Sequence, residues 1–215
     1  MPPNKARYAI TKKARSNPGL LLFVSMDHYG AMVTILFIHS AGPQGPGEGS
    51  SALLTGLRAV LPPRVALVAP LMPKPHAPEA EPWLMALDAE MRAIEGDFVM
   101  LGHSLGGSVI LQTLARFGVP DRLLGVVTLA APFWGAGGWE VEDFALPHDA
   151  STRLRALPRL VILQGDADEV VEKKHPNLYQ TLLPQALVTV LPGIDHEASS
   201  AAPAVLDALK SITPL

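Results

Sequence analysis

The chain has 215 residues, a formal net charge of −3 and no cysteine. The missing cysteines exclude disulfides and thiolate metal sites, and the weakly acidic balance disfavours a nucleic-acid binder, which normally presents a basic face. Hydrophobic residues make up 48% of the chain and charged residues 17%, so we expect one globular domain with a sizeable core. We expect a cytoplasmic protein with no nucleic-acid or membrane partner, no metal and no cofactor.

Residues 1–30 differ from the rest of the chain. Five basic side chains precede position 31 against a single acid, Asp27, and a short apolar run spans 20–24. The run is too short to cross a membrane and no convincing cleavage site follows it, so secretion is the less favoured interpretation. We expect a poorly ordered basic extension, or a translation start assigned too early, with Met26 or Met32 as the alternative starts.

From residue 33 onward, apolar runs alternate with helical patterns. Runs typical of strands buried on both faces of a sheet occur at 33–38, 65–68, 98–101, 124–130, 160–164 and 187–191. Helical patterns cover 51–61, 83–95, 109–115, 177–183 and 203–212. This alternation predicts an α/β fold, a doubly wound and mostly parallel sheet of about six core strands, within one domain of residues 31–215.

The stretch 98–107 organises this pattern. Four apolar residues run into Gly-His-Ser-Leu-Gly at 102–106, and an apolar helical pattern follows directly. This strand–turn–helix context is what a Gly-x-Ser-x-Gly nucleophile elbow requires, with glycines where the strand and the helix pass closely. The alternative is a glycine-rich turn with an incidental serine. We favour Ser104 as a nucleophile because both flanks of the motif fit.

A serine nucleophile needs a base, and the base needs an orienting acid. His196 follows the last predicted strand, and it alone of the seven histidines has this placement. Asp168 and Asp166 follow the strand before it, which produces the chain order Ser, Asp, His of α/β-hydrolases. We prefer Asp168 because the valines at 170–171 can anchor its loop. Asp166 is the alternative, and Asp195 adjoins the histidine.

The oxygen of an attacked carbonyl becomes negatively charged and needs two N–H donors. The amide of Leu105 begins the helix after the nucleophile, where the helix dipole favours negative charge, and the amide of Ala41 lies in the loop after the first strand. His39 and His103 flank this region, and we expect them to have structural or substrate-pocket roles. The remaining histidines are predicted to be surface or loop residues: His28, His76, His148 and His175.

Residues 132–158 interrupt the alternation at the carboxyl end of a strand. The segment is too long for an ordinary connection and carries Phe133, Trp134, Trp139 and Phe144 among glycines and acids. We expect a small cap that supplies aromatic walls, with Phe133, Trp134 and Trp139 in the substrate pocket. The alternative is an irregular loop whose aromatic residues pack onto the core.

Together these motifs resemble the α/β-hydrolase superfamily, and more narrowly its small single-domain serine hydrolases of the retinoblastoma-binding-protein-like group, many of them known only as predicted esterases. The resemblance covers about residues 33–212 and rests on these segments: Ile38-His39-Ser40-Ala41-Gly42, Pro70-Leu71-Met72-Pro73, Trp83, Gly102-His103-Ser104-Leu105-Gly106-Gly107-Ser108, Ala131-Pro132-Phe133-Trp134, Gly165-Asp166-Ala167-Asp168-Glu169-Val170-Val171 and Gly193-Ile194-Asp195-His196. It implies that the acid is the aspartate of Gly-x-x-Asp, which falls on Asp168. Such proteins usually have His-Gly after the first core strand, so we expect Ser40 to narrow the oxyanion loop.

The sequence therefore predicts a serine hydrolase, and more specifically a carboxylesterase that cleaves small or medium acyl esters. A nucleotide site in the glycine-rich loop 42–49 is excluded, because Glu48 stands where a P-loop needs lysine. Two alternatives remain: a non-catalytic protein-interaction module on the same fold, and an acyltransferase that uses the same three side chains. The expected partner is a small-molecule ester, and no protein partner is indicated.

Overall fold

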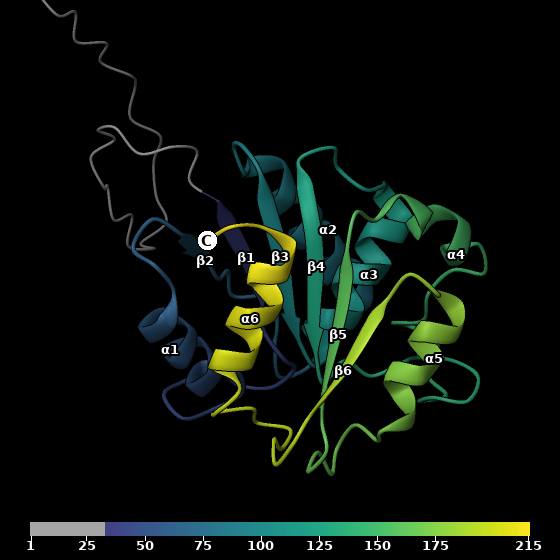
Figure 1. Cartoon of the computed structure of the whole chain (residues 1–215). Coiled ribbons are helices and arrows are strands. Elements are labelled where there is room, and N and C mark those ends of the chain that lie inside the picture. The colour runs from purple at the N-terminus through teal and green to yellow at the C-terminus, as the bar shows by residue number, and fades with distance from the viewer. Residues whose placement is uncertain (1–32) are drawn as a thin grey trace, which may run out of the picture.

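The structure, a computed structural model, describes residues 33–215. Its centre is a six-stranded sheet in the order β2-β1-β3-β4-β5-β6, and every neighbouring pair of strands is parallel (Figure 1). The strands are β1 Thr34–Ile38, β2 Ala66–Val68, β3 Phe98–His103, β4 Leu123–Leu129, β5 Leu160–Gly165 and β6 Leu187–Leu191. The predicted α/β fold is confirmed. The basic extension predicted for 1–30 and the position of His28 lie outside the described residues.

The strands are apolar throughout because helices cover both faces of the sheet. Successive side chains of β1 point to opposite faces. Ile35 and Phe37 join the core on one face, and Leu36 and Ile38 join the core on the other. None of the four is more than 1% exposed. A strand in this position shows a continuous apolar run in the sequence and no polar–apolar alternation.

The helices divide between the two faces of the sheet (Figure 1). One face is covered by α1 Ser51–Val60 and α6 Ala202–Ile212. The other face is covered by α2 Ala80–Ala93, α3 Leu105–Phe117, α4 Ala150–Arg153 with the short 3₁₀ helix η1 Leu154–Ala156, and α5 Lys174–Leu182. None of the helices within 33–215 is long and apolar enough to cross a bilayer.

Two helices begin three residues earlier than the sequence predicts, α2 at Ala80 and α5 at Lys174. In each helix the third residue is a proline, Pro82 or Pro176, and the prediction places the helix start after it. The N–H groups of a first helical turn have no partner within the helix, so a proline there removes no hydrogen bond.

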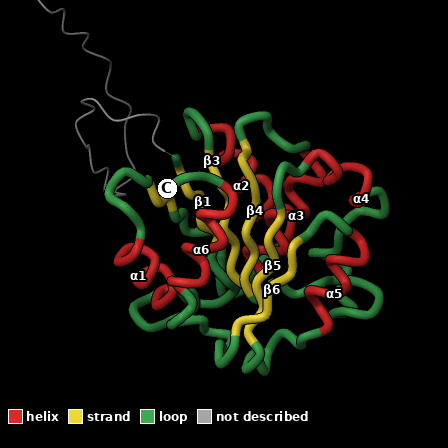
Figure 2. Tube along the Cα trace, in the orientation of Figure 1, coloured by secondary structure: helices red, strands yellow, loops and turns green. Residues whose placement is uncertain are grey.

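The sheet order creates a crevice at the carboxyl ends of β1 and β3. After β1 the chain moves to α1 on one face and outward to β2, whereas the helix after β3 lies on the opposite face. When the loops after two adjacent strands run to opposite faces of the sheet, they diverge, and the space between them can hold a ligand. Figure 2 shows the irregular segments that follow the strands at this end of the sheet. The candidate residues of the sequence analysis lie here.

Candidate active site

Ser104 lies at the sharp turn between β3 and α3. Its backbone has φ 52° and ψ −124°, in the left-handed region that residues with a side chain rarely adopt. A Cβ on Gly106 would overlap the carbonyl oxygen of Ile38, and a Cβ on Gly102 would come within 2.5 Å of the backbone of Gly107. The strand and the helix therefore pass each other with room for glycine alone, and the turn directs Ser104 into the crevice.

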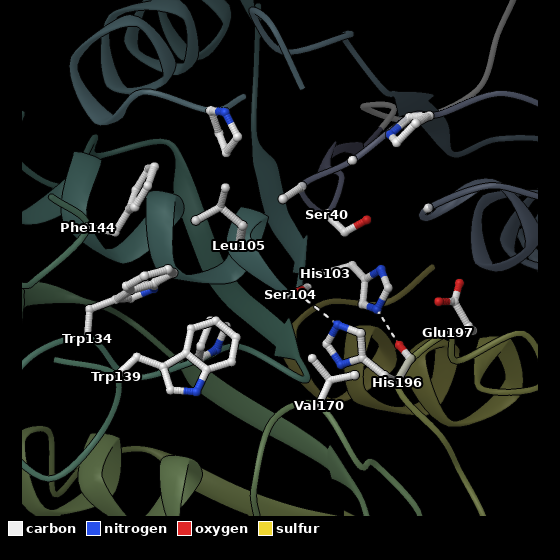
Figure 3. Close-up of a pocket in the computed structure, with 16 residues that line it drawn as sticks. Ser40, His103, Ser104, Leu105, Trp134, Trp139, Phe144, Val170, His196 and Glu197 are labelled. Carbon is white, nitrogen blue, oxygen red and sulfur yellow. Dashed lines mark hydrogen bonds between the residues drawn. The ribbon is translucent and has the colours of Figure 1, made fainter. Parts of the chain in front are cut away.

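The Ser104 hydroxyl faces His196, which follows β6. Ser104 Oγ lies 3.1 Å from His196 Nε2 (Figure 3). On the other side of the imidazole, His196 Nδ1 lies 3.0 Å from Asp168 Oδ2 and 3.2 Å from Oδ1. The three side chains thus form one hydrogen-bonded chain across the ends of β3, β6 and β5. Such a chain can remove the proton of a serine hydroxyl while the carboxylate orients the imidazole.

The Asp168 side chain is fully shielded from solvent and has three further donors. Oδ1 accepts the N–H of Val170 at 2.9 Å and of Val171 at 2.8 Å, and Oδ2 accepts the side-chain amide of Gln164 at 3.0 Å. Burial alone would raise the pKa of Asp168, but the hydrogen bonds from His196 and the two amides, with attraction to His196, hold the pKa below its ordinary value. The carboxylate therefore stays charged and fixed behind His196.

The two alternative aspartates are engaged elsewhere. Asp166 is exposed, and its Oδ1 accepts the N–H of Gly193 at 2.6 Å. Asp195 Oδ1 accepts the N–H of Ala198 at 3.0 Å. Within the described part of the chain neither carboxylate bonds to His196, and both stabilise turns. The geometry favours Asp168 as the orienting acid.

Ala41 and Leu105 line the cavity beside Ser104. Within residues 33–215 neither amide N–H donates a hydrogen bond. Leu105 is the first residue of α3, so its N–H has no acceptor within the helix. The amides on both sides of Ala41, by contrast, donate to groups of the surrounding loops. The two donors proposed from the sequence are therefore available to an oxyanion, and that role stays a prediction.

The two histidines beside the site are buried and hydrogen-bonded. His103 Nε2 lies 2.8 Å from the carbonyl oxygen of His196, and its Nδ1 lies 2.8 Å from Ser50 Oγ. His39 Nε2 accepts the N–H of Met72 at 2.9 Å, so its Nδ1 donates to the carbonyl oxygen of the following residue at 2.6 Å. Burial lowers the pKa of both rings, to about 4 for His103. His103 lines the cavity and His39 does not, because its ring joins the end of β1 to the 70–73 loop.

A cavity of about 350 Å³ opens beside Ser104. Trp134, Trp139 and Phe144 form one wall, and the loop after β1 faces them together with His196 and Glu197 (Figure 3). Among the described residues that line the cavity there is no lysine or arginine, and Glu197 supplies the single carboxylate. No three His, Cys, Asp or Glu side chains within 33–215 form a group that could hold a metal ion.

Some side chains of the 132–158 segment line the cavity, and others pack against the core. Trp134 Nε1 donates to Ser108 Oγ at 3.0 Å, and the ring contacts Trp139 and Phe144 with centroid distances of 5.0 and 5.1 Å. Phe133, expected in the pocket, lies outside the cavity lining because its ring packs edge-on against the buried Tyr179, 5.0 Å away. Whether the segment acts as a cap stays a prediction.

The structure adds supporting residues that the sequence analysis does not single out. Gln164, Ser50 and Ser108 are buried polar residues that bond to Asp168, His103 and Trp134 respectively. In the sequence, Gln164 could be identified as a candidate supporting residue because it is a polar residue directly after the apolar run of β5.

The surface or loop position predicted for His175 is wrong. The side chain is fully buried at the start of α5, where Nδ1 accepts the N–H of Phe133 at 2.9 Å and the ring packs edge-on against Trp139. This contact between α5 and the 132–158 segment is tertiary and leaves no local pattern in the sequence. His76 and His148 are exposed, as predicted.

Several solved structures share this fold over most of the chain. The ydeN gene product of B. subtilis is 17% identical, with a TM-score of 0.67 over 83% of this chain and 97% of that one. Est1E of Butyrivibrio proteoclasticus is 15% identical, with a TM-score of 0.60 over 83% and 85%. XC6422 of Xanthomonas campestris, an α/β serine hydrolase without a lid, is 20% identical, with a TM-score of 0.56 over 83% and 79%. At these identities the likeness shows the fold.

The amino-acid sequence, and not the fold, assigns the chain to a family. A family model described as serine hydrolase matches residues 64–190, which is more than half of the chain. The match includes Ser104 and Asp168 and ends before His196. No curated protein matches the sequence. The predicted resemblance is confirmed at this level: the chain belongs to the serine hydrolase family and has the α/β-hydrolase fold.

Proposed function

We propose that the protein is a carboxylesterase that hydrolyses small or medium acyl esters through an acyl-enzyme. One observation carries the proposal: the unbroken chain Ser104–His196–Asp168 lies beside two amides that have no acceptor within residues 33–215. This combination supplies a nucleophile, a proton carrier and donors for the developing charge. A module that only bound a protein would have no chemical use for a buried carboxylate behind His196.

Acylation begins when Ser104 Oγ attacks the ester carbonyl carbon and its proton passes to His196 Nε2. The resulting oxyanion accepts hydrogen bonds from the Leu105 and Ala41 amides, and each such donor contributes about 3 kcal/mol to transition-state stabilisation. The C–O bond to the alcohol then breaks, and the alcohol leaves with the proton from Nε2. Asp168 keeps Nδ1–H oriented and stabilises the imidazolium throughout.

Deacylation repeats these steps with water. A water molecule gives a proton to His196 Nε2 and attacks the acyl carbon, and the oxyanion again forms beside Leu105 and Ala41. Collapse of this intermediate breaks the bond to Ser104 Oγ, which regains its proton from Nε2. The carboxylic acid leaves, and the enzyme returns to its starting state with all atoms balanced.

The cavity lining supports an uncharged acyl group. Trp134, Trp139 and Phe144 offer apolar ring surface for an alkyl or aryl chain. An anionic acyl group would find no cationic partner among the described lining residues and would meet the carboxylate of Glu197. We therefore expect esters of neutral, apolar acids to be the preferred substrates.

The first test is labelling with a fluorophosphonate probe, which reacts with activated serine hydroxyls. Wild-type protein and a Ser199→Ala control, whose serine is exposed and outside the cavity, should be labelled, and Ser104→Ala should not. Hydrolysis of p-nitrophenyl esters of increasing acyl length should then show turnover that Ser104→Ala abolishes. An added alcohol acceptor would reveal acyl transfer as a second product.

The outcome that contradicts the proposal is a folded wild-type protein that neither reacts with the probe nor cleaves any ester. That result would favour the binding-module alternative. Labelling that persists in Ser104→Ala would place the reactive serine elsewhere and contradict the assignment of Ser104.

A further inference from the structure

A second series of hydrogen bonds lies next to the series Ser104–His196–Asp168 and starts at His103, the residue before Ser104. His103 is 1% exposed, and its Nε2 lies 2.8 Å from the carbonyl oxygen of His196 (Figure 3). On its other side, Nδ1 lies 2.8 Å from Ser50 Oγ. His103 therefore contacts the backbone of His196, while the ring of His196 faces Ser104.

Ser50 carries this chain into the loop after β1. Its Oγ accepts the N–H of Ser40 at 2.8 Å and lies 3.1 Å from Ser40 Oγ. The Gln44 side chain closes the loop: it donates to the carbonyl oxygens of Ser40 at 3.1 Å and Gly42 at 3.0 Å, and accepts the N–H of Ser50 at 3.0 Å. These bonds flank Ala41 and fix the direction of its N–H.

The partners of His103 determine its tautomer. A carbonyl oxygen only accepts, so Nε2 carries the proton and donates to His196, and Nδ1 accepts the hydroxyl proton of Ser50. The titratable groups that influence the ring are His196, Asp168 and His39, and burial lowers its pKa to about 4. The neutral ring makes two directed bonds and adds no charge beside the Asp168–His196 pair.

We propose that His103 is a positioning residue that ties the loop of His196 and, through Ser50, the loop of Ala41 to the elbow of Ser104. The inference rests on the proposed function, because it concerns the same reaction. Three segments that are distant in the sequence supply the nucleophile, the base and the second oxyanion donor, and His103 connects them. A misplacement of about 1 Å in such a site costs about 100-fold in rate. Loss of the connection should lower kcat and leave KM nearly unchanged, since the aromatic wall binds the acyl group.

The test compares two substitutions of one side chain. His103→Phe fills the space of the ring and removes both hydrogen bonds. His103→Gln retains an N–H that can donate to the His196 carbonyl and an oxygen that can accept from Ser50. We expect His103→Phe to lower kcat by about 10- to 100-fold with KM changed less than about 3-fold, and His103→Gln to recover most of this loss. Ser50→Ala should lower kcat in the same direction by a smaller factor.

A double-mutant cycle tests whether Ser50 acts through His103. Ser50→Ala should lower kcat less in the His103→Phe background than in the wild type, because part of its effect has already been removed. Fold-changes that simply multiply would show that the two residues act independently and would overturn the connection.

All rates are expressed per mole of Ser104 that reacts with the fluorophosphonate probe, so that misfolded protein does not lower the measured kcat. Wild-type kcat in His103→Phe, or equal losses in His103→Phe and His103→Gln, would overturn the proposal. If circular dichroism shows that His103→Phe does not fold, Ser50→Ala decides, and an unchanged kcat there overturns the proposal. A wild-type protein that the probe never labels would instead contradict the proposed function, so the two failures are distinguishable.

Discussion

Ser104 stands between two regions that are built differently (Figure 3). On one side lie buried polar groups: the Asp168 side chain is fully shielded and His103 is 1% exposed, and both are held by hydrogen bonds of 2.8 to 3.2 Å. On the other side lie Trp134 and Trp139, which are half-buried and meet ring against ring with centroids 5.0 Å apart.

The two kinds of interaction specify different properties. A hydrogen bond requires a particular distance and direction, so the polar region determines where the reacting atoms lie. Contacts between rings are less directional and determine the shape and the apolar character of a wall. We therefore expect substitutions in the polar region to change kcat, and substitutions in the aromatic region to change which ester is preferred.

The largest effect should come from the carboxylate behind His196. Asp168→Asn should lower kcat by about 10⁴-fold, because an amide cannot stabilise the imidazolium and favours the wrong tautomer. Asp166→Asn is the matched control, two residues away and exposed, and should change kcat by less than about 3-fold. Steady-state hydrolysis of the best ester by both variants gives the measurement. A greater loss in Asp166→Asn would reverse the assignment of the acid.

The sheet and the elbow are predictable from the sequence because they depend on residues that are close in the chain. A strand buried on both faces needs an uninterrupted apolar run, which β1 shows, and the elbow needs glycines at fixed spacings from Ser104. The order of Ser104, Asp168 and His196 follows from the same local signals, since each comes directly after a predicted strand. The start of α2 differs from the prediction because Pro82 is compatible with a first helical turn.

The supporting residues depend on tertiary contacts and leave no such signal. Ser50 stands directly before α1, a position typical of a capping serine, yet its hydroxyl caps no helix N–H and bonds to His103, which is 53 positions away. His175 is polar and lies in a stretch with charged neighbours, yet α5 buries it under Phe133 and Trp139. Which of two adjacent rings faces the cavity, Phe133 or Trp134, likewise depends on what packs beneath them.

A second prediction uses the low pKa of His103 and concerns stability. The folded ring has a pKa of about 4, whereas an unfolded histidine has a pKa of about 6.5. Between these values the unfolded chain binds more protons, so the free energy of unfolding falls as the pH falls from about 6.5 to about 4. His39 and His175 also have a lowered pKa and act with the same sign, so the contribution of His103 must be measured by difference.

Between pH 7 and pH 5 the free energy of unfolding of the wild type should fall by about 2 kcal/mol more than that of His103→Gln. Urea unfolding at both pH values provides the measurement. Trp134→Ala serves as the control from the aromatic region: it removes no titratable group and should keep the full pH dependence of the wild type. Equal pH dependence in the wild type and His103→Gln would contradict a buried neutral His103.

The third prediction concerns the aromatic wall. Trp134→Ala removes ring surface that contacts Trp139 and Phe144, so the wall should bind bulky acyl groups less tightly. The kcat/KM for an aryl or medium-chain ester should fall by about 10-fold relative to the acetate ester. Val141→Ala, in the same 132–158 segment but exposed and outside the cavity lining, should leave the ratio unchanged. An equal loss for acetate would mean that Trp134 supports the reacting atoms and not the acyl group.

The smallest expected effect comes from Glu197, the single carboxylate among the described lining residues, opposite the tryptophans. A choline ester and its neutral carbon analogue, a 3,3-dimethylbutyl ester, differ mainly in charge. The wild type should favour the choline ester by about 2- to 5-fold in kcat/KM at low salt, as expected for an exposed charge. Glu197→Gln should remove this preference, and Glu169→Gln, exposed and outside the lining, should retain it.

Because Glu197 adjoins His196, its substitution can also change the rate of the chemical step. The ratio of the two esters cancels that change, since both react through the same groups. Added salt at about 1 M reduces the Debye length to about 3 Å and should abolish the charge preference, whereas the acyl preference that depends on Trp134 should persist. A preference that survives in Glu197→Gln, or in high salt, would show that shape and not charge discriminates on this side, and the two regions would then differ only in how rigidly they are held.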